Sequence, residues 1–298
     1  MNTRGEEIAG SALSAGRLAL VEHVRAWAMR HGLDAGARPR QALAIATYVE
    51  LCAPPGAAHH HLEVLAELTA LFFHLDDIGA SGIHALAQLQ QLPGVAAFFA
   101  GFDARVHGSA RHRERLVASF EIWLAAIVEE LQVDFATVSV ARHWDLRRRN
   151  AFIDPYVDGW LAVLELEPPP ALAAELARAR FAARDLIILA NDLGSWERDR
   201  VRDGELADPN LIATRAREAA SSDAEALAWI VAQHDRIAGA CTDDLLVLAG
   251  CGGPARRVAA LLSSIVRGNV EAMRQLADRY EGARGVLDRL RLPPPVDA

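Results

Sequence analysis

The chain has 298 residues, of which 52% are hydrophobic, and a formal net charge of −8. A chain of this length can bury one large core, and its acidic balance argues against nucleic acid as a partner. All 31 basic residues are arginine, which excludes Schiff-base catalysis and a Walker-type phosphate loop, because both depend on lysine.

Apolar residues recur at helical spacing along nearly the whole chain, and the clearest alternating β-type fragment is the short run 137–140. No repeat period or shift in composition marks a linker. We therefore predict one all-α domain over residues 1–298, with loose termini at 1–6 and 292–298. Helices are predicted at 7–32, 39–53, 59–77, 83–91, 94–101, 110–131, 134–151, 155–165, 170–200, 208–220, 222–250 and 254–281.

An acidic pair, Asp76 and Asp77, stands at the end of the predicted helix 59–77. Carboxylates are poorly placed there, because the helix dipole puts partial negative charge at this end. A bound divalent metal ion or a buried arginine would offset that charge. An ordinary helix stop at Gly79 accounts for the segment equally well.

Two later segments carry arginines suited to phosphate groups. Arg147, Arg148 and Arg149 precede a helix break, and Arg279 is followed by Tyr280 near the end of the last predicted helix. The planar guanidinium group offers a fork of donors that matches a diphosphate. Taken alone, each segment is equally consistent with a solvated surface.

The most informative pattern lies in the predicted helix 170–200. Asn191, Ser195 and Asp199 stand four residues apart, so their side chains share one stripe of the helix. An amide oxygen, a hydroxyl and a carboxylate are hard oxygen ligands suited to Mg²⁺. A solvated helix face produces the same pattern.

Taken together, these segments resemble the class I terpene synthases of bacteria over about residues 60 to 282. That family carries an Asp-Asp-x-x-Asp/Glu motif at the end of one helix, and Asp76 and Asp77 match its first two positions. A later helix of the family carries Asn-Asp-x-x-Ser-x-x-x-Glu. This motif is matched by Asn191, Asp192, Ser195 and Asp199, with aspartate in place of the final glutamate.

The arginine segments match two further features of the family. Ahead of the second motif lies a diphosphate-sensing arginine, matched by Arg147, with Asn150 and Ala151 at the following linker and effector positions. An Arg-Tyr pair near the family's C-terminus hydrogen-bonds diphosphate, and Arg279 and Tyr280 match it.

The resemblance implies an α-helical bundle around an apolar cavity, and a terpene cyclase that acts on a linear isoprenoid diphosphate with three Mg²⁺ ions. The implied metal ligands are Asp76, Asp77, Asn191, Ser195 and Asp199. The implied diphosphate-binding residues are Arg147, Arg198, Arg279 and Tyr280, of which Arg147, Arg279 and Tyr280 are also expected to be catalytic. Phe72 and Phe152 are expected to line the cavity, where aromatic faces stabilise positive charge.

Two departures from the family pattern bear on the substrate. Ala80 stands at the third acidic position of the first motif, and Asp199 is one methylene shorter than glutamate. The truncated motif resembles that of some bacterial diterpene cyclases, of the ent-kaurene synthase type. We therefore expect geranylgeranyl diphosphate as the substrate, with farnesyl diphosphate next.

Other interpretations remain open at this point. A trans-prenyl chain elongase would need two full Asp-Asp-x-x-Asp motifs and usually a lysine. A non-catalytic helical protein that binds an isoprenoid or a partner would be consistent with Ala80. His59 and Glu63 share a helix face but fall short of a zinc site, and the pair Asp243 and Asp244 fits a solvated face.

Other features predict a cytoplasmic protein. Its three cysteines, Cys52, Cys241 and Cys251, are not clustered, which fits reduced thiols. Pro93 and several polar residues interrupt the longest uncharged run, so no stable membrane insertion is expected. The first residues lack the basic start and apolar run of a signal peptide. A homodimer is compatible with the resemblance.

Overall fold

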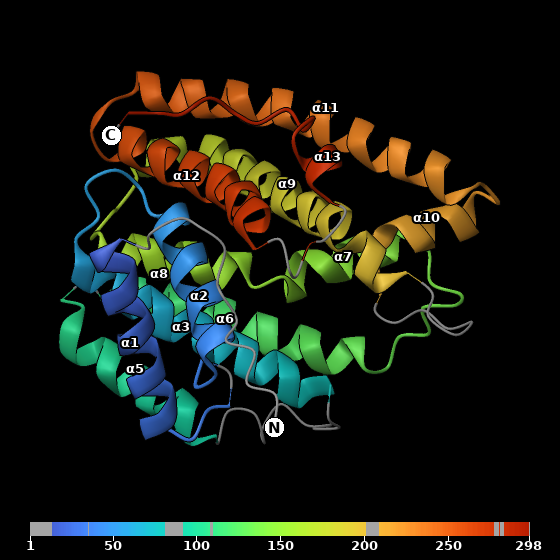
Figure 1. Cartoon of the computed structure of the whole chain (residues 1–298). Helices are drawn as coiled ribbons and strands as arrows, with labels where there is room; N and C mark the ends of the chain where they lie inside the picture. The colour runs from blue at the N-terminus through green and yellow to red at the C-terminus, as the bar shows by residue number, and fades with distance from the viewer. Residues whose placement is uncertain are drawn as a thin grey trace, which may run out of the picture.

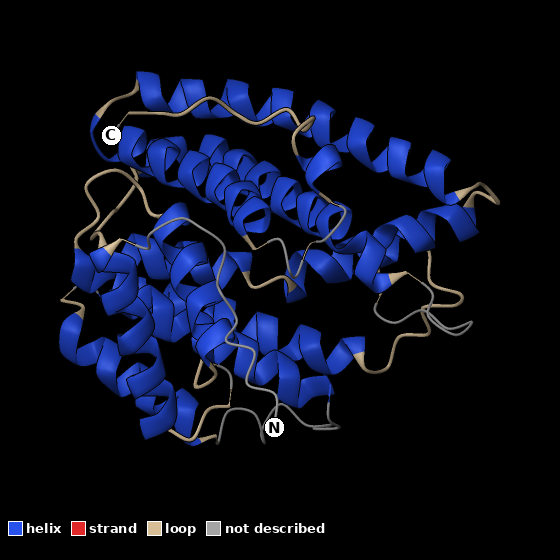
Figure 2. Cartoon of the chain, in the orientation of Figure 1, coloured by secondary structure: helices blue, strands red, loops and turns tan. Residues whose placement is uncertain are grey.

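The computed structural model describes residues 14–34, 36–80, 92–107, 110–200, 209–276, 280 and 283–297, with only the backbone at 77–80 and 93. All regular structure in these ranges is helical, which confirms the all-α class (Figure 2). The helices are α1 (Ala15–Arg30), α2 (Pro39–Cys52), α3 (His59–Ala80), α5 (Pro93–Arg105), α6 (Ala110–Glu130), α7 (Val140–Asn150), α8 (Ile153–Val163), a 3₁₀ turn (Pro170–Leu172), α9 (Ala173–Asp199), α10 (Leu211–Glu218), α11 (Asp223–Gly250), α12 (Gly253–Gln275) and α13 (Arg284–Leu287). The predicted helix 83–91 and the N-terminal segment 1–6 lie outside the described residues.

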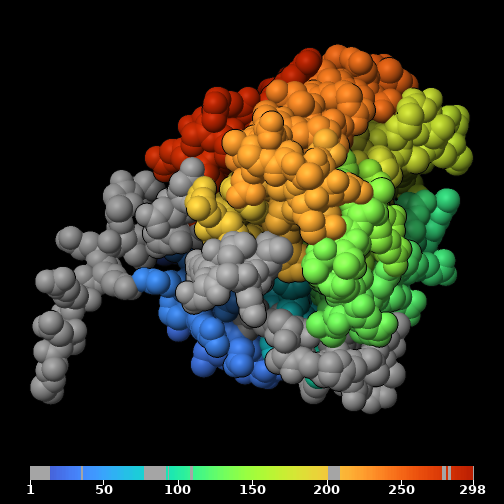
Figure 3. All heavy atoms as spheres, turned by 90° about the vertical axis from the view of Figure 1, so that its right-hand side faces the viewer, coloured from blue at the N-terminus to red at the C-terminus, as the bar shows by residue number. Residues whose placement is uncertain are grey.

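The helices form two groups that face each other (Figure 1). One group contains α9, α11 and α12, which pack along one another; the other contains α1, α2, α3, α5, α6 and α8. Packing of α12 against α2 joins the two groups. The helices α7 and α10 pack together at one end of the molecule, where α10 and α11 (orange) lie beside α7 (green) in Figure 3.

The start of α7 corrects a predicted boundary. The helix begins at Val140 rather than 134, because Ser139 has an extended backbone and its hydroxyl accepts a hydrogen bond from the Arg142 N–H. This is the usual arrangement of a serine N-cap. The fragment 137–140 therefore forms the cap of a helix and no strand. A Ser139 cap places the arginine-rich segment in the last turn of α7.

The break between α7 and α8 is set by Phe152. Its backbone has φ of 63°, in the left-handed region that few residues other than glycine adopt. Helix α8 starts at the next residue, Ile153. The turn directs the Phe152 ring inward, where it is 4% exposed.

The predicted loose C-terminus is held in place as far as it is described. Residues 292–297 run back along α12 (Figure 1). The Ser263 hydroxyl donates to the Pro294 carbonyl oxygen at 2.7 Å, and Arg267 donates to the Pro293 carbonyl oxygen at 3.0 Å. In the described residues no helix is both long and apolar enough to span a membrane.

Gly268 lets α2 and α12 approach closely. A Cβ at Gly268 would lie 2.2 Å from the Leu51 carbonyl oxygen, closer than any real contact. The same crossing brings the Cys52 thiol to 3.7 Å from the Ile265 carbonyl oxygen. Close backbone approach at a crossing is a recurrent use of glycine. The separation of the two helix groups therefore depends on this position.

We expect Gly268→Ala to lower the free energy of unfolding by about 3 kcal/mol, because overpacking against fixed backbone strains the crossing. Gly250→Ala is the matched control, since a Cβ at Gly250 meets open space. Urea denaturation of both variants and the wild type measures the effect. Equal stabilities of the two variants would contradict the role given to Gly268.

Candidate active site

A cavity of about 660 Å³ lies between the two groups of helices. Residues of α2, α3, α6, α7, α8, α9 and α12 line it. The polar stripe of α9 and the sensor segment of α7 contribute charged and amide groups, whereas α2, α3 and α8 contribute mostly aromatic side chains. The cavity thus has a polar part and an apolar part.

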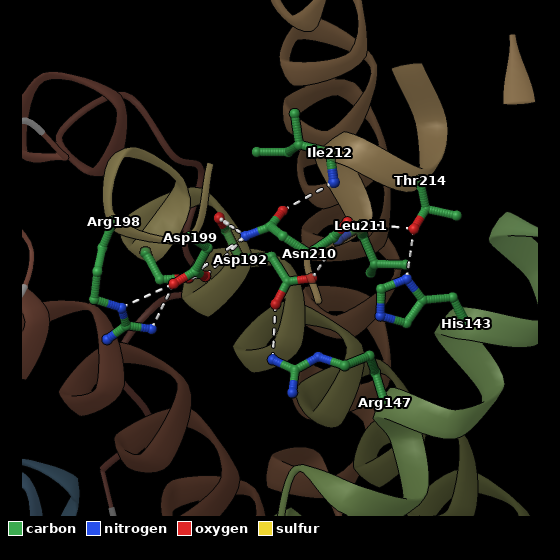
Figure 4. Close-up of polar contacts among 10 residues, drawn as sticks. His143, Arg147, Asp192, Arg198, Asp199, Asn210, Leu211, Ile212 and Thr214 are labelled. Atoms are coloured by element: carbon green, nitrogen blue, oxygen red, sulfur yellow. Dashed lines mark hydrogen bonds and ion pairs between the residues drawn. The ribbon is translucent and has the colours of Figure 1, made fainter. Parts of the chain in front are cut away.

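The stripe on α9 faces this cavity and not solvent. Asn191, Ser195 and Asp199 all line the cavity, and Ser195 and Asp199 are 3% and 4% exposed. The Ser195 hydroxyl donates a hydrogen bond to the Asp199 carboxylate. The Arg198 guanidinium pairs with the same carboxylate, with Nε 2.8 Å from Oδ1 (Figure 4). The burial of Ser195 and Asp199 excludes the solvated-face interpretation.

Asn210 holds this stripe from outside α9, and the sequence analysis missed it. Its Nδ2 donates to the Asp192 carbonyl oxygen at 2.9 Å and to Asp199 Oδ2 at 3.2 Å. Its Oδ1 accepts from the Ile212 N–H at 2.9 Å, which makes Asn210 the N-cap of α10 (Figure 4). Asparagine followed by an apolar run is a helix-start signal, but the predicted helix 208–220 began before it.

Arg147 is the one arginine of its triplet that lines the cavity. Its Nη2 lies 2.7 Å from Asp192 Oδ1, and Asp192 Oδ2 accepts the Leu211 N–H at 3.0 Å (Figure 4). Arg148 instead makes two 2.8 Å hydrogen bonds to Asp185.

The third arginine, Arg149, pairs with Glu129 and Asp145. This arrangement supports the expected position of the sensor at Arg147.

Burial and the neighbouring carboxylates shift the pKa of Arg147 in opposite directions. Burial alone lowers the pKa of Arg147, but Asp192 and Glu130 outweigh it and the pKa is raised. Burial raises the pKa of Glu130, which also lines the cavity. His143, one turn before Arg147, is buried, and desolvation lowers its pKa to about 3. The histidine is therefore neutral at pH 7 and adds no charge beside the arginine.

Two expected site residues, Asp77 and Arg279, stand beside described residues that line the cavity. Asp76 is exposed and lines the cavity, whereas the side chain of Asp77 lies outside the described residues. Arg279 also lies outside them, but its neighbour Tyr280 lines the cavity. A Cβ at Gly194 would lie 3.3 Å from Tyr280 Cδ1 and 2.9 Å from the Met273 sulfur. The glycine within α9 therefore lets Tyr280 approach the stripe.

Aromatic rings form one wall of the cavity. Phe72 and Phe152 both line it and stack with centroids 4.6 Å apart and planes 17° apart. Trp123 packs edge-on against Phe152 at 4.8 Å. Tyr48 and Tyr156 continue the wall, with ring centroids 5.4 Å apart. Such a surface presents π-faces to whatever occupies the apolar part.

The donor set of α9 fits a hard divalent cation. In the described residues no three His, Cys, Asp or Glu side chains converge as metal ligands. The donors facing the cavity are instead an amide, a hydroxyl and a carboxylate, with Asp76 on the opposite helix α3. Oxygen donors of this mixed kind suit Mg²⁺ rather than zinc.

The remaining acidic and histidine candidates lie elsewhere. His59 Nε2 is 3.8 Å from Glu63 Oε1 in the first turns of α3, and Glu63 also faces His23 at 3.7 Å. Asp244 pairs with Arg178, and Asp243 is exposed, as expected for a solvated face. Neither pair lines the cavity.

Comparison with known proteins agrees with the helical fold. Residues 94–238 match the model of terpene synthase family 2, C-terminal metal binding. No curated protein sequence matches the chain. The fold is shared with linalool/nerolidol synthase from Streptomyces clavuligerus in complex with 2-fluorogeranyl diphosphate, at a TM-score of 0.76 and 21% identity, covering 87% of this chain and 99% of that one.

Two further solved structures share the fold. Germacradien-4-ol synthase from Streptomyces citricolor matches at a TM-score of 0.72 and 19% identity, covering 90% of this chain and 97% of that one. 2-Methylisoborneol synthase from Streptomyces coelicolor A3(2), in complex with Mg²⁺ and geranyl-S-thiolodiphosphate, matches at 0.73 and 17% identity, covering 93% and 98%. The helical fold is therefore the one that these bacterial terpene synthases share, and the family match over residues 94–238 agrees with the class that the motifs predicted.

We expect Asn210→Ala to lower the free energy of unfolding by about 2 kcal/mol, because it removes an N-cap and leaves buried groups without a donor. Asn210→Asp separates these two roles. It keeps the cap oxygen but places a second carboxylate beside Asp199. Guanidinium denaturation at pH 7 should therefore find the aspartate variant no more stable than the alanine variant. If Asn210→Asp had wild-type stability, Asn210 would stabilise the protein only as the N-cap of α10.

Proposed function

We propose that this chain, as a single catalytic domain, is a metal-dependent terpene cyclase that ionises a linear isoprenoid diphosphate and closes the resulting cation into a ring. One observation carries the proposal. The stripe Asn191, Ser195 and Asp199, of which Ser195 and Asp199 are buried, opens onto the same cavity as the guanidinium of Arg147, and the other wall of that cavity is aromatic. Surfaces suited to binding an anion and to stabilising a cation thus share one cavity.

The polar part of the cavity would bind the diphosphate. Arg147 is already oriented there by Asp192, so little side-chain entropy is lost when it binds an anion. Arg198, Tyr280 and, by resemblance, Arg279 would complete the set of donors. Donors placed where negative charge develops favour the departure of the leaving group.

Asp76, Asn191, Ser195 and Asp199 would hold Mg²⁺, and by resemblance Asp77 with them, three ions in all. When bound, the ions neutralise the growing charge of the diphosphate. The chain's own part is to keep the oxygen donors in place, which Asn210 and Arg198 do through their hydrogen bonds to Asp199. Asp199, although shorter than glutamate, lies in the cavity lining.

The apolar part of the cavity would bind the isoprenoid chain. The rings of Phe72 and Phe152 form a fixed surface, because their stacking and the left-handed turn at Phe152 hold them in place. Aromatic faces stabilise a passing positive charge. The shape of the cavity would fold the isoprenoid chain, and the apolar lining would limit the access of water to the cation.

The proposed length of the isoprenoid substrate is inferred from the first acidic motif alone. The truncated first motif supports geranylgeranyl diphosphate, with farnesyl diphosphate as the second choice. Two of the similar structures contain analogues of geranyl diphosphate, so they lend this choice no support. The elongase alternative lacks its lysine and second acidic motif. The non-catalytic alternative does not account for three intact donors in the cavity.

Incubation with geranyl, farnesyl and geranylgeranyl diphosphates plus Mg²⁺, followed by gas chromatography with mass spectrometry, tests the proposal. We expect a cyclic product, the highest kcat/KM on the C20 substrate, and no turnover in excess chelator. The ratio of kcat/KM values identifies the preferred substrate. All three substrates carry the same diphosphate, so its binding cannot favour one chain length over another. A C15 preference would correct the length alone. Turnover in excess chelator would show that the reaction needs no metal ion. Absence of turnover on all three substrates would favour the alternative of a non-catalytic binding protein.

We expect Arg147→Ala to lower kcat about 100-fold or more, the effect of removing one donor from a developing negative charge. Arg149→Ala is the matched control and should stay near the wild-type rate, since Arg149 pairs with Glu129 and Asp145 away from the cavity. Arg148→Ala should mainly lower stability, because it leaves the buried Asp185 without its cationic partner. A dead Arg148→Ala variant with normal stability would move the sensor by one residue.

A further inference from the structure

The carboxylate of Asp199 is surrounded by donors from the protein itself. Its Oδ2 accepts hydrogen bonds from the Ser195 hydroxyl and, at 3.2 Å, from Asn210 Nδ2. Its Oδ1 faces the Arg198 guanidinium, with Nε at 2.8 Å and Nη2 at 2.7 Å. A carboxylate has about four lone-pair positions, and these donors fill them. A metal ion that binds Asp199 would therefore have to displace one of the donors.

Arg198 is the donor that can leave. The Ser195 oxygen has lone pairs of its own and can bind a metal ion while its hydrogen stays on Asp199. Asn210 is 1% exposed and fixed at the start of α10, where its Oδ1 accepts the Ile212 N–H. The Arg198 side chain, in contrast, is 36% exposed and lines the cavity. Its departure from Asp199 would break no contact between helices.

The place of Asp199 in α9 explains why a cation lies beside it. Asp199 is the last residue of the helix and is 4% exposed. The helix dipole puts partial negative charge at this end, and a buried carboxylate is costly without a counter-charge. Arg198 supplies that charge from the adjacent position of the chain (Figure 4). A divalent cation on the same carboxylate would supply it as well, so the two cations are alternatives.

We propose that Arg198 competes with Mg²⁺ for the carboxylate of Asp199, and that a bound diphosphate draws the guanidinium away from it. The proposal rests on the proposed function, in which Arg198 binds the diphosphate. A diphosphate offers the guanidinium a partner with more negative charge and more acceptor oxygens than one carboxylate. Once Arg198 has turned to the diphosphate, the lone pairs of Oδ1 are available to Mg²⁺.

This competition couples the binding of the two ligands. Without diphosphate, Mg²⁺ has to displace Arg198 and binds weakly at Asp199. Without Mg²⁺, diphosphate has to take Arg198 from Asp199. Coupling between two ligands is reciprocal, so each ligand strengthens the binding of the other. Return of Arg198 to Asp199 would likewise favour the release of Mg²⁺ after the diphosphate has left.

Calorimetric titration with Mg²⁺ alone tests the first direction. Arg198→Gln should lower the Kd for Mg²⁺ about fivefold or more, within the usual range of coupling between two ligands, because no guanidinium has to be displaced. Arg200→Gln is the matched control. It removes the same charge two residues further on, where Arg200 pairs with the exposed Glu197 at 3.0 Å outside the cavity lining. Its Kd should stay close to that of the wild type.

Titration with inorganic diphosphate in excess chelator tests the reverse direction. Asp199→Asn removes the carboxylate that holds Arg198, so the Kd for diphosphate should fall about fivefold or more. Glu197→Gln is the control, because it removes the same charge beside Arg200. In the double variant of Arg198→Gln and Asp199→Asn the gain should disappear, since the released guanidinium is no longer there.

The outcomes separate this inference from the proposed function. An unchanged Kd for Mg²⁺ in Arg198→Gln, or an unchanged Kd for diphosphate in Asp199→Asn, would overturn the inference while the proposed function stands. If Arg198→Gln does not fold, the titration of Asp199→Asn decides alone. Absence of Mg²⁺ binding in every protein, with and without diphosphate, would instead end the proposed metal site, and the proposed function and this inference with it.

Discussion

The ion pair between Arg147 and Asp192 is the interaction on which the rest of the site depends. Asp192 is 1% exposed and also accepts the Leu211 N–H, so one carboxylate joins α7, α9 and α10. A buried carboxylate is tolerated only when its charge and its lone pairs are satisfied. These contacts of Asp192 fix the orientation of α9, on which the neighbouring Asn191 faces the cavity. They also hold the guanidinium of Arg147 at the cavity wall.

The same arrangement concentrates charge in one part of an otherwise apolar space. Arg147 and Arg198 lie among carboxylates that they partly neutralise, and Arg198 does so directly at Asp199. Interactions between charges are stronger there than in water, because the surroundings are less polarisable. In the proposed reaction an entering diphosphate would therefore meet donors that are already oriented, and a positively charged intermediate would lie against the rings of Phe72 and Phe152.

Close packing between helices sets the shape of the cavity. Gly268 sets how closely α2 and α12 cross, and Gly194 lets Tyr280 and Met273 reach α9. Both are glycines inside helices, where they would otherwise weaken the structure. Their role is to set the contour of the cavity, which residues of α2, α9 and α12 line.

Helical periodicity was enough to predict the all-α class and the shared face of Asn191, Ser195 and Asp199, because residues four apart on a helix are neighbours whatever surrounds them. The ordered motifs also singled out Arg147 within its triplet. Only the tertiary structure decided that the stripe lines the cavity, that Asn210 holds Asp199 from the start of another helix, and that residues 292–297 run back along α12. These contacts join segments far apart in the chain, and they are set by packing between helices, about which local spacing carries no information.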